Sequence, residues 1–229
     1  MELKLSKWGN SLALRLPLSV TKSLHLEDGD TLEININKLR EIVLTPINAF
    51  DKADFLHKLQ EMHRKNISYN LARIKKHGEL SDMIYVDTSV IVTMLTNVAD
   101  TQISIDWFCS LEVIPISGEC LIAEFNSAIA LMQSNSQLSE RKMKSILSLF
   151  EELISGGIKL LPVNREVFKK ASDLIYNEPT MPVRTSLHLG IALASDANEF
   201  VTLDAEQYAF ANKLGFSGKL LDANKLTIK

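Results

Sequence analysis

Apolar and polar residues alternate along the first 45 positions, which predicts a small β-rich unit. The alternation covers residues 3–5 and 12–16, and the interruption at 8–11 predicts a turn that joins two short strands. Pro17 suits the first residue of a short helix. Two more strands are predicted at 32–36 and 42–44. Because a unit of this size buries too little apolar surface to be stable alone, we expect it to dimerise.

The hydrophobic period changes to that of an α-helix after residue 50. Phe55, Leu59 and Met62 fall on one helical stripe, and charged residues occupy the opposite face. An amphipathic segment outside a compact unit must bury its stripe against a partner or against the rest of its own chain. Residues 78–82 then predict a short linker, so we treat 46–82 as a helical linker segment.

Beyond this linker, short apolar runs alternate with longer amphipathic stretches. The predicted strands are 83–87, 112–116, 158–163, 200–204 and 219–222, and the predicted helices include 121–132, 140–154, 167–176 and 187–195. Alternating strands and helices predict an α/β domain with a mostly parallel sheet over residues 83–229. In such sheets, ligands bind at the carboxyl ends of the strands.

The composition is that of a folded globular protein, with 46% hydrophobic and 23% charged residues in 229. No apolar run is long enough to span a bilayer, and charges stand where a signal peptide has its apolar stretch, so we expect a cytoplasmic protein without a membrane role. Cys109 and Cys120 match neither a disulfide framework nor a CxxC motif. We expect both to be reduced core residues without a function.

The formal net charge of −3 is distributed unevenly. Residues 1–82 hold 13 Lys and Arg against 11 Asp and Glu, whereas residues 83–229 hold 12 against 17. Residues 1–26 hold four basic side chains, Lys4, Lys7, Arg15 and Lys22, against the single acid Glu2. An acidic average therefore does not exclude a nucleic-acid partner, because the phosphate backbone responds to a local basic patch.

Two of the predicted strands end in an acid, and this places candidate chemistry at the sheet edge. Asp87 and Asp204 would project toward the same edge, and Glu124 in the following helix could face it as well. Converging carboxylates repel one another unless a cation binds, and hard oxygen ligands suit Mg²⁺ or Mn²⁺. Such a cluster is what a metal-dependent phosphodiester hydrolase needs.

Each of these acids also has a structural alternative. Asp204, followed three residues later by glutamine, resembles a capping box, and Asp87 could cap the helix after its strand. Glu124 alone is typical of a solvated helix position. Thr88 and Ser89 are better suited to orienting Asp87 or capping the next helix than to acting as nucleophiles.

Residues 83–229 resemble a PIN domain of the VapC toxin type. The resemblance rests on MIYVDTSVIV, AEFNSAI and VTLDAEQYAFANKLG, in that order along the chain. It implies a Mg²⁺- or Mn²⁺-dependent endoribonuclease, a hydrolase acting on RNA. The four acidic positions of that family correspond to Asp87, Glu124, Ser186 and Asp204.

Ser186 departs from the family pattern, which has Asp at this position. Asp87, Glu124 and Asp204 can still hold one Mg²⁺, which often uses only one or two carboxylates, but a second ion would lose much of its support. His188 lies two residues further along a helix, turned by about 200°. We therefore expect His188 to face away from the acids and to be structural.

Residues 1–45 resemble the swapped-hairpin AbrB/MazE-like domain of VapB-type antitoxins, on the stretch KWGNS followed by an arginine and Pro17. That family binds operator DNA as an intertwined dimer. The resemblance implies Lys7, Asn10, Ser11 and Arg15 as candidate DNA contacts. From the residues alone, without the resemblance, a solvated strand face is the better explanation of Lys7 and Arg15.

Such antitoxins inhibit through a C-terminal segment that wraps the toxin, and residues 46–82 resemble that segment. Phe55, Leu59 and Met62 would then be the buried anchors. Arg64 or Arg73 would enter the acidic pocket and pair with its carboxylates, although either arginine could also be solvated.

Together these features predict a single-chain toxin–antitoxin fusion. Its parts are a DNA-binding dimerisation domain at 1–45, a masking segment at 46–82 and a PIN nuclease at 83–229, which starts at Met83. The main alternative is a DNA-binding autorepressor whose PIN domain is attenuated or inactive because of Ser186. A third possibility is an active nuclease without a DNA role.

Overall fold

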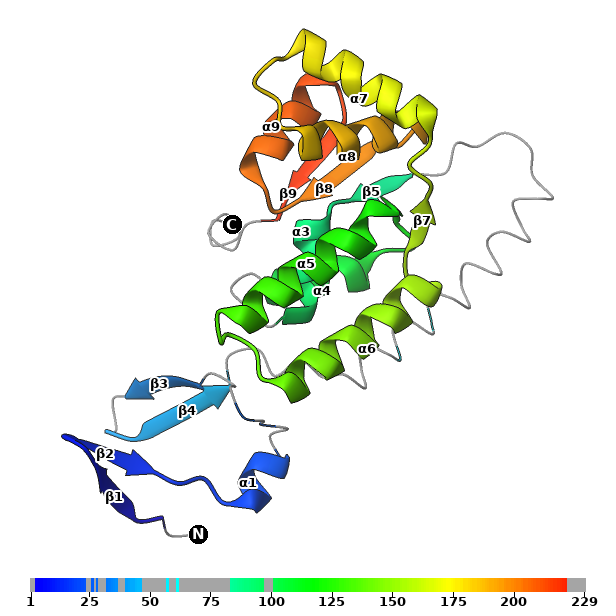
Figure 1. Ribbon diagram of the computed structural model, residues 1–229. Helices are drawn as coiled ribbons and strands as arrows, with labels where there is room; N and C mark the ends of the chain where they lie inside the picture. The colour runs from blue at the N-terminus through cyan, green and yellow to red at the C-terminus, as the bar shows by residue number, and fades with distance from the viewer. Residues whose placement is uncertain are drawn as a thin grey trace. The chain divides into compact units, whose positions relative to one another are not determined.

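The computed structural model describes residues 3–23, 26, 28, 32–36, 40–46, 57, 61, 83–96 and 101–221 (Figure 1). The chain divides into two compact units, Met1–Phe50 and Asp51–Lys229. Each unit is considered by itself below.

The first unit consists of two antiparallel hairpins and a short helix. Strand β1 (Leu5–Trp8) pairs with β2 (Ser11–Leu14), helix α1 spans Leu18–Ser23, and β3 (Leu32–Ile36) pairs with β4 (Ile42–Pro46). The first turn places Gly9 at φ +60°, a left-handed conformation that glycine adopts at no steric cost. The predicted strands, turn and helix of this unit are confirmed.

Few apolar side chains of the first unit are buried within the chain. Trp8 is 79% exposed and Ile36 73% exposed. Several other apolar residues share this exposure: Leu5, Leu12, Leu18, Ile34 and Ile42. The two hairpins form separate two-stranded sheets in the part of the chain that is described. The unit therefore presents an apolar surface that a stable small domain normally covers.

The second unit is built on a five-stranded parallel sheet with the order β7-β6-β5-β8-β9. Its strands are β5 (Ile84–Val86), β6 (Ile116–Gly118), β7 (Lys159–Leu161), β8 (Glu199–Thr202) and β9 (Ser217–Leu220). Its helices are α3 (Thr88–Thr96), α4 (Thr101–Ser110), α5 (Cys120–Ser134), α6 (Glu140–Gly156), α7 (Arg165–Asn177), α8 (Val183–Ala194) and α9 (Ala205–Lys213). The predicted α/β class with a parallel sheet is confirmed.

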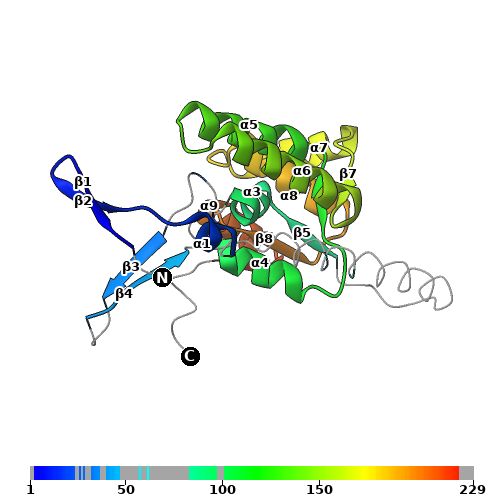
Figure 2. The same cartoon turned by 90° about the horizontal axis from the view of Figure 1, so that it is seen from below.

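Side chains from the central strands and flanking helices form the core of this unit. The rings of Tyr85 on β5 and Phe200 on β8 are both fully buried and stack with 5.2 Å between centroids. Helices α5 and α6 lie side by side (Figures 1 and 2). Between them, the buried rings of Phe125 and Phe150 stack with 3.9 Å between centroids. This core holds the carboxyl ends of β5, β6 and β8 at one edge.

One predicted strand lies away from its expected position. The sequence pattern placed the second strand of this domain at 112–116, but β6 begins at Ile116. Pro115 has no N–H group, so it cannot donate to the ladder, and the paired stretch starts after it.

Cys109 and Cys120 are both only partly buried, so the expectation that they are core residues is wrong. Among the helices described, none is both long and apolar enough to span a lipid bilayer.

Candidate functional site

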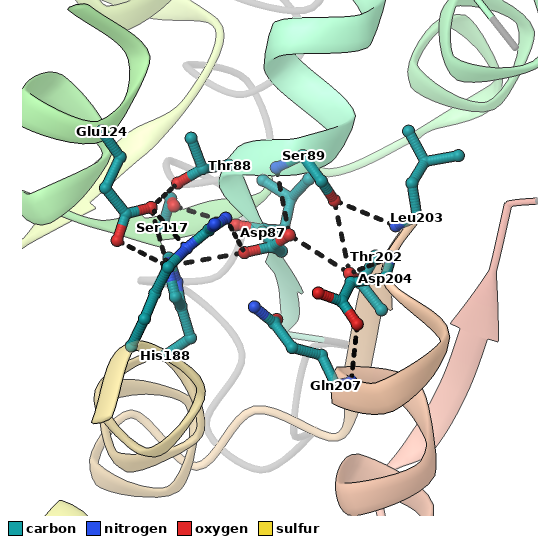
Figure 3. Close-up of polar contacts among 12 residues, drawn as sticks. Asp87, Thr88, Ser89, Ser117, Glu124, His188, Thr202, Leu203, Asp204 and Gln207 are labelled. Atoms are coloured by element: carbon teal, nitrogen blue, oxygen red, sulfur yellow. Dashed lines mark hydrogen bonds and ion pairs between the residues drawn. The ribbon is translucent and has the colours of Figure 1, made fainter. Parts of the chain in front are cut away.

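Asp87 is the central residue of a polar cluster at the carboxyl edge of the sheet (Figure 3). It follows β5 directly, and its side chain is 0% exposed. Its backbone N–H donates to the carbonyl oxygen of Val201 on β8 at 2.9 Å. The polypeptide thus carries a carboxylate into the protein interior at the end of a central strand.

One oxygen of Asp87 is held by the surrounding chain. Oδ2 accepts hydrogen bonds from the Ser89 backbone N–H at 3.0 Å and from the Thr202 hydroxyl at 3.1 Å. The Ser89 hydroxyl in turn accepts from the Leu203 N–H. Asp87 therefore caps the first turn of α3, as one of the predicted alternatives has it, and Ser89 helps to fix this geometry.

The other oxygen of Asp87 has no hydrogen-bond partner among the described residues. Oδ1 lies 3.4 Å from His188 Nε2 and 3.8 Å from Arg184 Nη2. The first contact is misaligned and the second is too long for a hydrogen bond. A buried carboxylate oxygen without a partner is costly, so it calls for a ligand or a role.

Glu124 reaches the same cluster from α5. Its Oε2 accepts from the Thr88 hydroxyl and lies 3.0 Å from His188 Nε2, while Arg184 Nε lies 3.4 Å away. Burial by itself would raise the pKa of Glu124. The hydrogen bond and charge of His188, the Thr88 hydroxyl and Arg184 outweigh burial and lower that pKa below its usual value. The Glu124 side chain is therefore ionised at neutral pH.

His188 stands between the two carboxylates, so the expectation that it faces away from them is wrong. The ring is fully buried on α8, and its Nδ1 lies 2.7 Å from the Tyr85 hydroxyl. Burial, followed by the charges of Cys120 and Asp87, raises the pKa of Tyr85 well above its usual value. The phenol therefore keeps its proton, and its hydroxyl can donate to Nδ1 or accept from Nδ1–H according to the tautomer of the imidazole, while Nε2 faces Glu124.

Positions 186 and 188 do lie about 200° apart around the helix, as expected. It is His188, however, and not Ser186, that faces the carboxylates. Ser186 is the residue that turns away: it is buried, and its hydroxyl donates to the Val183 carbonyl of its own helix at 2.8 Å. The neutral hydroxyl of Ser186 is thus used within α8.

Asp204 lies on the opposite side of Asp87 from Glu124 (Figure 3). Its Oδ1 accepts from the N–H groups of Glu206 at 2.8 Å and Gln207 at 3.0 Å, which makes it the N-cap of α9. Its own N–H donates to the Thr202 hydroxyl that holds Asp87. Asp204 is therefore linked to the cluster through Thr202, and the predicted capping role is confirmed.

One observation indicates that the residues present fit a divalent cation: the buried oxygen of Asp87 without a hydrogen-bond partner among the described residues lies beside the ionised Glu124. A ligand atom of Cys120 also lies near this point. Cys120, Glu124 and His188 each offer one ligand atom, and these three atoms lie within 4.8 Å of one another. Burial, and next the charge of Glu124, raises the pKa of the Cys120 thiol to about 11.

Sequence reasoning missed His188 and Arg184 as members of the cluster. Both lie on α8 and are separated by four residues, so they share one helix face. An arginine and a histidine at this spacing, in a chain with candidate acids at a sheet edge, were the signal available. The Arg184 side chain is 52% exposed and brings a positive charge to the rim of the cluster.

The residues predicted to contact DNA lie in the first unit. Lys7 and Ser11 stand on paired strands, Asn10 is in the turn between them, and Arg15 follows β2. All four are exposed. This placement agrees equally with a nucleic-acid contact and with a solvated face.

The residues predicted to mask the nuclease lie outside the described residues: Phe55, Leu59, Met62, Arg64 and Arg73. Their role stays a prediction, as does the division of the chain at residues 45 and 82.

Residues 5–52 match the family model described as antidote-toxin recognition MazE, bacterial antitoxin. The N-terminal part of the chain is therefore similar to an antitoxin domain. It is followed by an α/β region with a five-stranded parallel sheet. No curated protein matches the chain.

Proposed function

We propose that this chain is a single-chain toxin–antitoxin protein whose second unit is a PIN-type, metal-dependent endoribonuclease. The observation that carries the proposal is the convergence of Asp87 and Glu124, from two separate elements, on one buried point at the carboxyl edge of a parallel sheet. The ordered motifs of residues 83–229 and the adjoining antitoxin-type domain support it.

Asp87 and Glu124 would hold Mg²⁺ or Mn²⁺, with Asp204 at the adjacent edge. When bound, the ion would polarise the scissile phosphate and activate water for attack. Ser89 and Thr202 immobilise one oxygen of Asp87, which leaves Oδ1 directed into the cluster. Arg184 at the rim can contact the phosphate backbone of RNA, because a guanidinium matches phosphate geometry.

The second candidate is an autorepressor with an attenuated nuclease. Two observations favour it. The hydroxyl of Ser186 is bonded within its own helix and supplies no third negative charge. His188 and Arg184 also lie against Asp87 and Glu124 at distances that partly neutralise them.

In both cases we propose that the antitoxin-type domain binds operator DNA as a dimer. The exposed apolar side chains of the two hairpins supply the area that a second copy would bury. Lys7, Asn10, Ser11 and Arg15 would contact the DNA. Lys7→Ala should weaken binding and reduce the slope of log affinity against log salt by about 1 in a mobility-shift series.

The nuclease proposal is tested with the full chain carrying a specific protease site between Gly78 and Asp82. Tethering holds an inhibitor at high effective concentration, so cutting should raise metal-dependent RNA cleavage, up to the roughly 10²- to 10⁴-fold that tethering can contribute. Asp87→Asn in the same background should abolish cleavage. No cleavage after cutting, with Mg²⁺ or Mn²⁺ present, contradicts the enzymatic proposal.

The linker-cutting experiment also separates the two candidates. Metal-dependent cleavage that Asp87→Asn abolishes supports the nuclease, whereas a folded chain that stays inert after cutting favours the autorepressor. A carboxylate added at position 186 would not distinguish them, because Ser186 turns away from the cluster.

A further inference from the structure

Three residues bring unlike donor atoms to one point beside Asp87. Cys120 and Glu124 stand one turn apart at the start of α5, and His188 reaches the same point from α8. A sulfur, a carboxylate oxygen and an imidazole nitrogen from these side chains lie within 4.8 Å of one another. This donor set is mixed, unlike the all-oxygen set that Mg²⁺ prefers.

The buried Asp87 oxygen supplies a second, independent observation. Oδ1 is fully buried, has no hydrogen-bond partner among the described residues, and points to His188 Nε2 at 3.4 Å. Glu124 Oε2 lies 3.0 Å from the same nitrogen. Ligands at bond lengths of 2.0–2.3 Å around a tetrahedral ion stand about 3.3–3.8 Å apart. The distances of 3.0 Å and 3.4 Å from Nε2 are close to this range, whereas the donor atoms of Cys120, Glu124 and His188, which lie within 4.8 Å of one another, would draw closer around an ion.

The His188 ring is also oriented as a metal ligand requires. In the Nδ1–H tautomer the ring donates to the Tyr85 hydroxyl oxygen at 2.7 Å, so that the Nε2 lone pair is directed at the carboxylate side of the cluster. Tyr85 is itself fixed by stacking on Phe200. Metal-binding histidines almost always have their second nitrogen held by such a partner, which sets the tautomer and the ring plane.

We propose that Cys120, Glu124 and His188 form a site for a borderline-soft transition-metal ion of the Zn²⁺ class, with the Asp87 oxygen that is unpartnered among the described residues beside it. Imidazole and sulfur donors favour such ions over Mg²⁺. Arg184, at 3.4 Å from Glu124 Oε2, supplies the positive charge that balances an excess of anionic ligands. The inference deepens the proposed function, on which it rests for the use of Asp87 and Glu124, by changing the class of metal.

The test is calorimetric titration of the full metal-free chain with Zn²⁺, Mn²⁺ and Mg²⁺ separately. Zn²⁺ is expected to bind one ion per chain at this site and more tightly than Mg²⁺. His188→Gln should weaken Zn²⁺ binding by more than the roughly 10- to 100-fold that loss of an outer partner costs, and Tyr85→Phe should weaken it by about that amount. Circular dichroism of each variant verifies that it is folded.

Cobalt provides a spectroscopic readout that does not depend on activity. Co²⁺ bound to the full chain should show a sulfur-to-metal charge-transfer band, and Cys120→Ser should remove it. Cys109→Ser is the matched control, because Cys109 lies on α4 outside the cluster and should leave the band unchanged. Loss of the band in the control instead would overturn the assignment.

The two proposals fail in different ways. The mixed-donor site is overturned if the chain binds Mg²⁺ and Zn²⁺ with equal affinity, or if His188→Gln and Cys120→Ser leave Zn²⁺ binding unchanged. Either result is still compatible with Mg²⁺-dependent nuclease activity. Tight Zn²⁺ binding that needs both side chains, in a chain that cleaves no RNA, supports the site and contradicts the nuclease.

Discussion

The two units of the chain bury their apolar side chains to very different degrees. In the second unit, central strands such as Ile84–Val86 are buried throughout, as expected for a parallel sheet covered on both faces. In the first unit, strand residues such as Ile36 and Ile42 are mostly exposed. The second unit has an interior of its own, whereas the described apolar side chains of the first are left exposed, which is why we propose a partner surface for it.

The largest expected effect comes from the interior of the second unit. Phe200→Ala removes a ring that stacks on Tyr85 and should lower the free energy of unfolding by about 3–5 kcal/mol. Trp8→Phe in the background leaves Trp107 as the fluorescent reporter of this unit during denaturant unfolding. Phe168→Ala, an exposed ring, should change stability by no more than about 0.5 kcal/mol. Equal losses of unfolding free energy in Phe200→Ala and Phe168→Ala would contradict the expected difference between a buried and an exposed ring.

The next effect concerns the partner of the first unit. If a second copy buries Ile36, then Ile36→Asp should weaken dimerisation by about 1.5–3 kcal/mol, on the order of 10- to 100-fold in Kd. Analytical ultracentrifugation over a concentration series measures this shift. Tyr176→Asp, on an exposed residue of the second unit, should leave the dimer intact. A wild-type chain that stays monomeric throughout contradicts the expectation.

A smaller effect separates the capping role of Asp204 from its proposed part in metal binding. Asp204→Ala removes the acceptor for two N–H groups of α9 and should cost about 1 kcal/mol of stability. Asp204→Asn keeps the cap and should stay near wild type in thermal unfolding. If RNA cleavage after linker cutting falls in both variants, the carboxylate contributes beyond capping. Wild-type cleavage by Asp204→Asn would limit Asp204 to its structural role.

The smallest effect is a pH dependence at the cluster. Because the pKa of Glu124 is lower in the folded chain, its contribution to stability is present above the unfolded pKa and is lost as pH falls through the folded pKa. In the presence of a chelator, the melting temperatures of wild type and Glu124→Gln should therefore converge at low pH. Glu151→Gln, an exposed residue of α6, is the control. A constant difference at every pH contradicts this assignment.

Much of the fold could be predicted from local patterns. Alternation with period two in residues 3–16 and 32–44 predicted the hairpins, and the apolar run that ends at Asp87 predicted a central strand. The start of β6 could not be predicted from apolarity alone, because Pro115 continues the apolar run but has no N–H group to donate to the ladder.

The candidate site was only partly predictable. A strand that ends in an acid places that acid at the sheet edge, and for Asp87 this local argument was sufficient. The phase of α8 was not available from the sequence. A helix of twelve residues can present either Ser186 or His188 to the sheet, and only packing selects between these faces.

The sequence alone determined the class of each unit and the chemistry at its disposal, because periodicity and residue type are local properties of the chain. Only the tertiary structure decided which donors meet. Asp87, Glu124 and His188 are brought to one point by three elements whose relative rotation depends on how the whole core packs. The same packing turned Ser186 into its own helix and left one oxygen of Asp87 without a partner among the described residues.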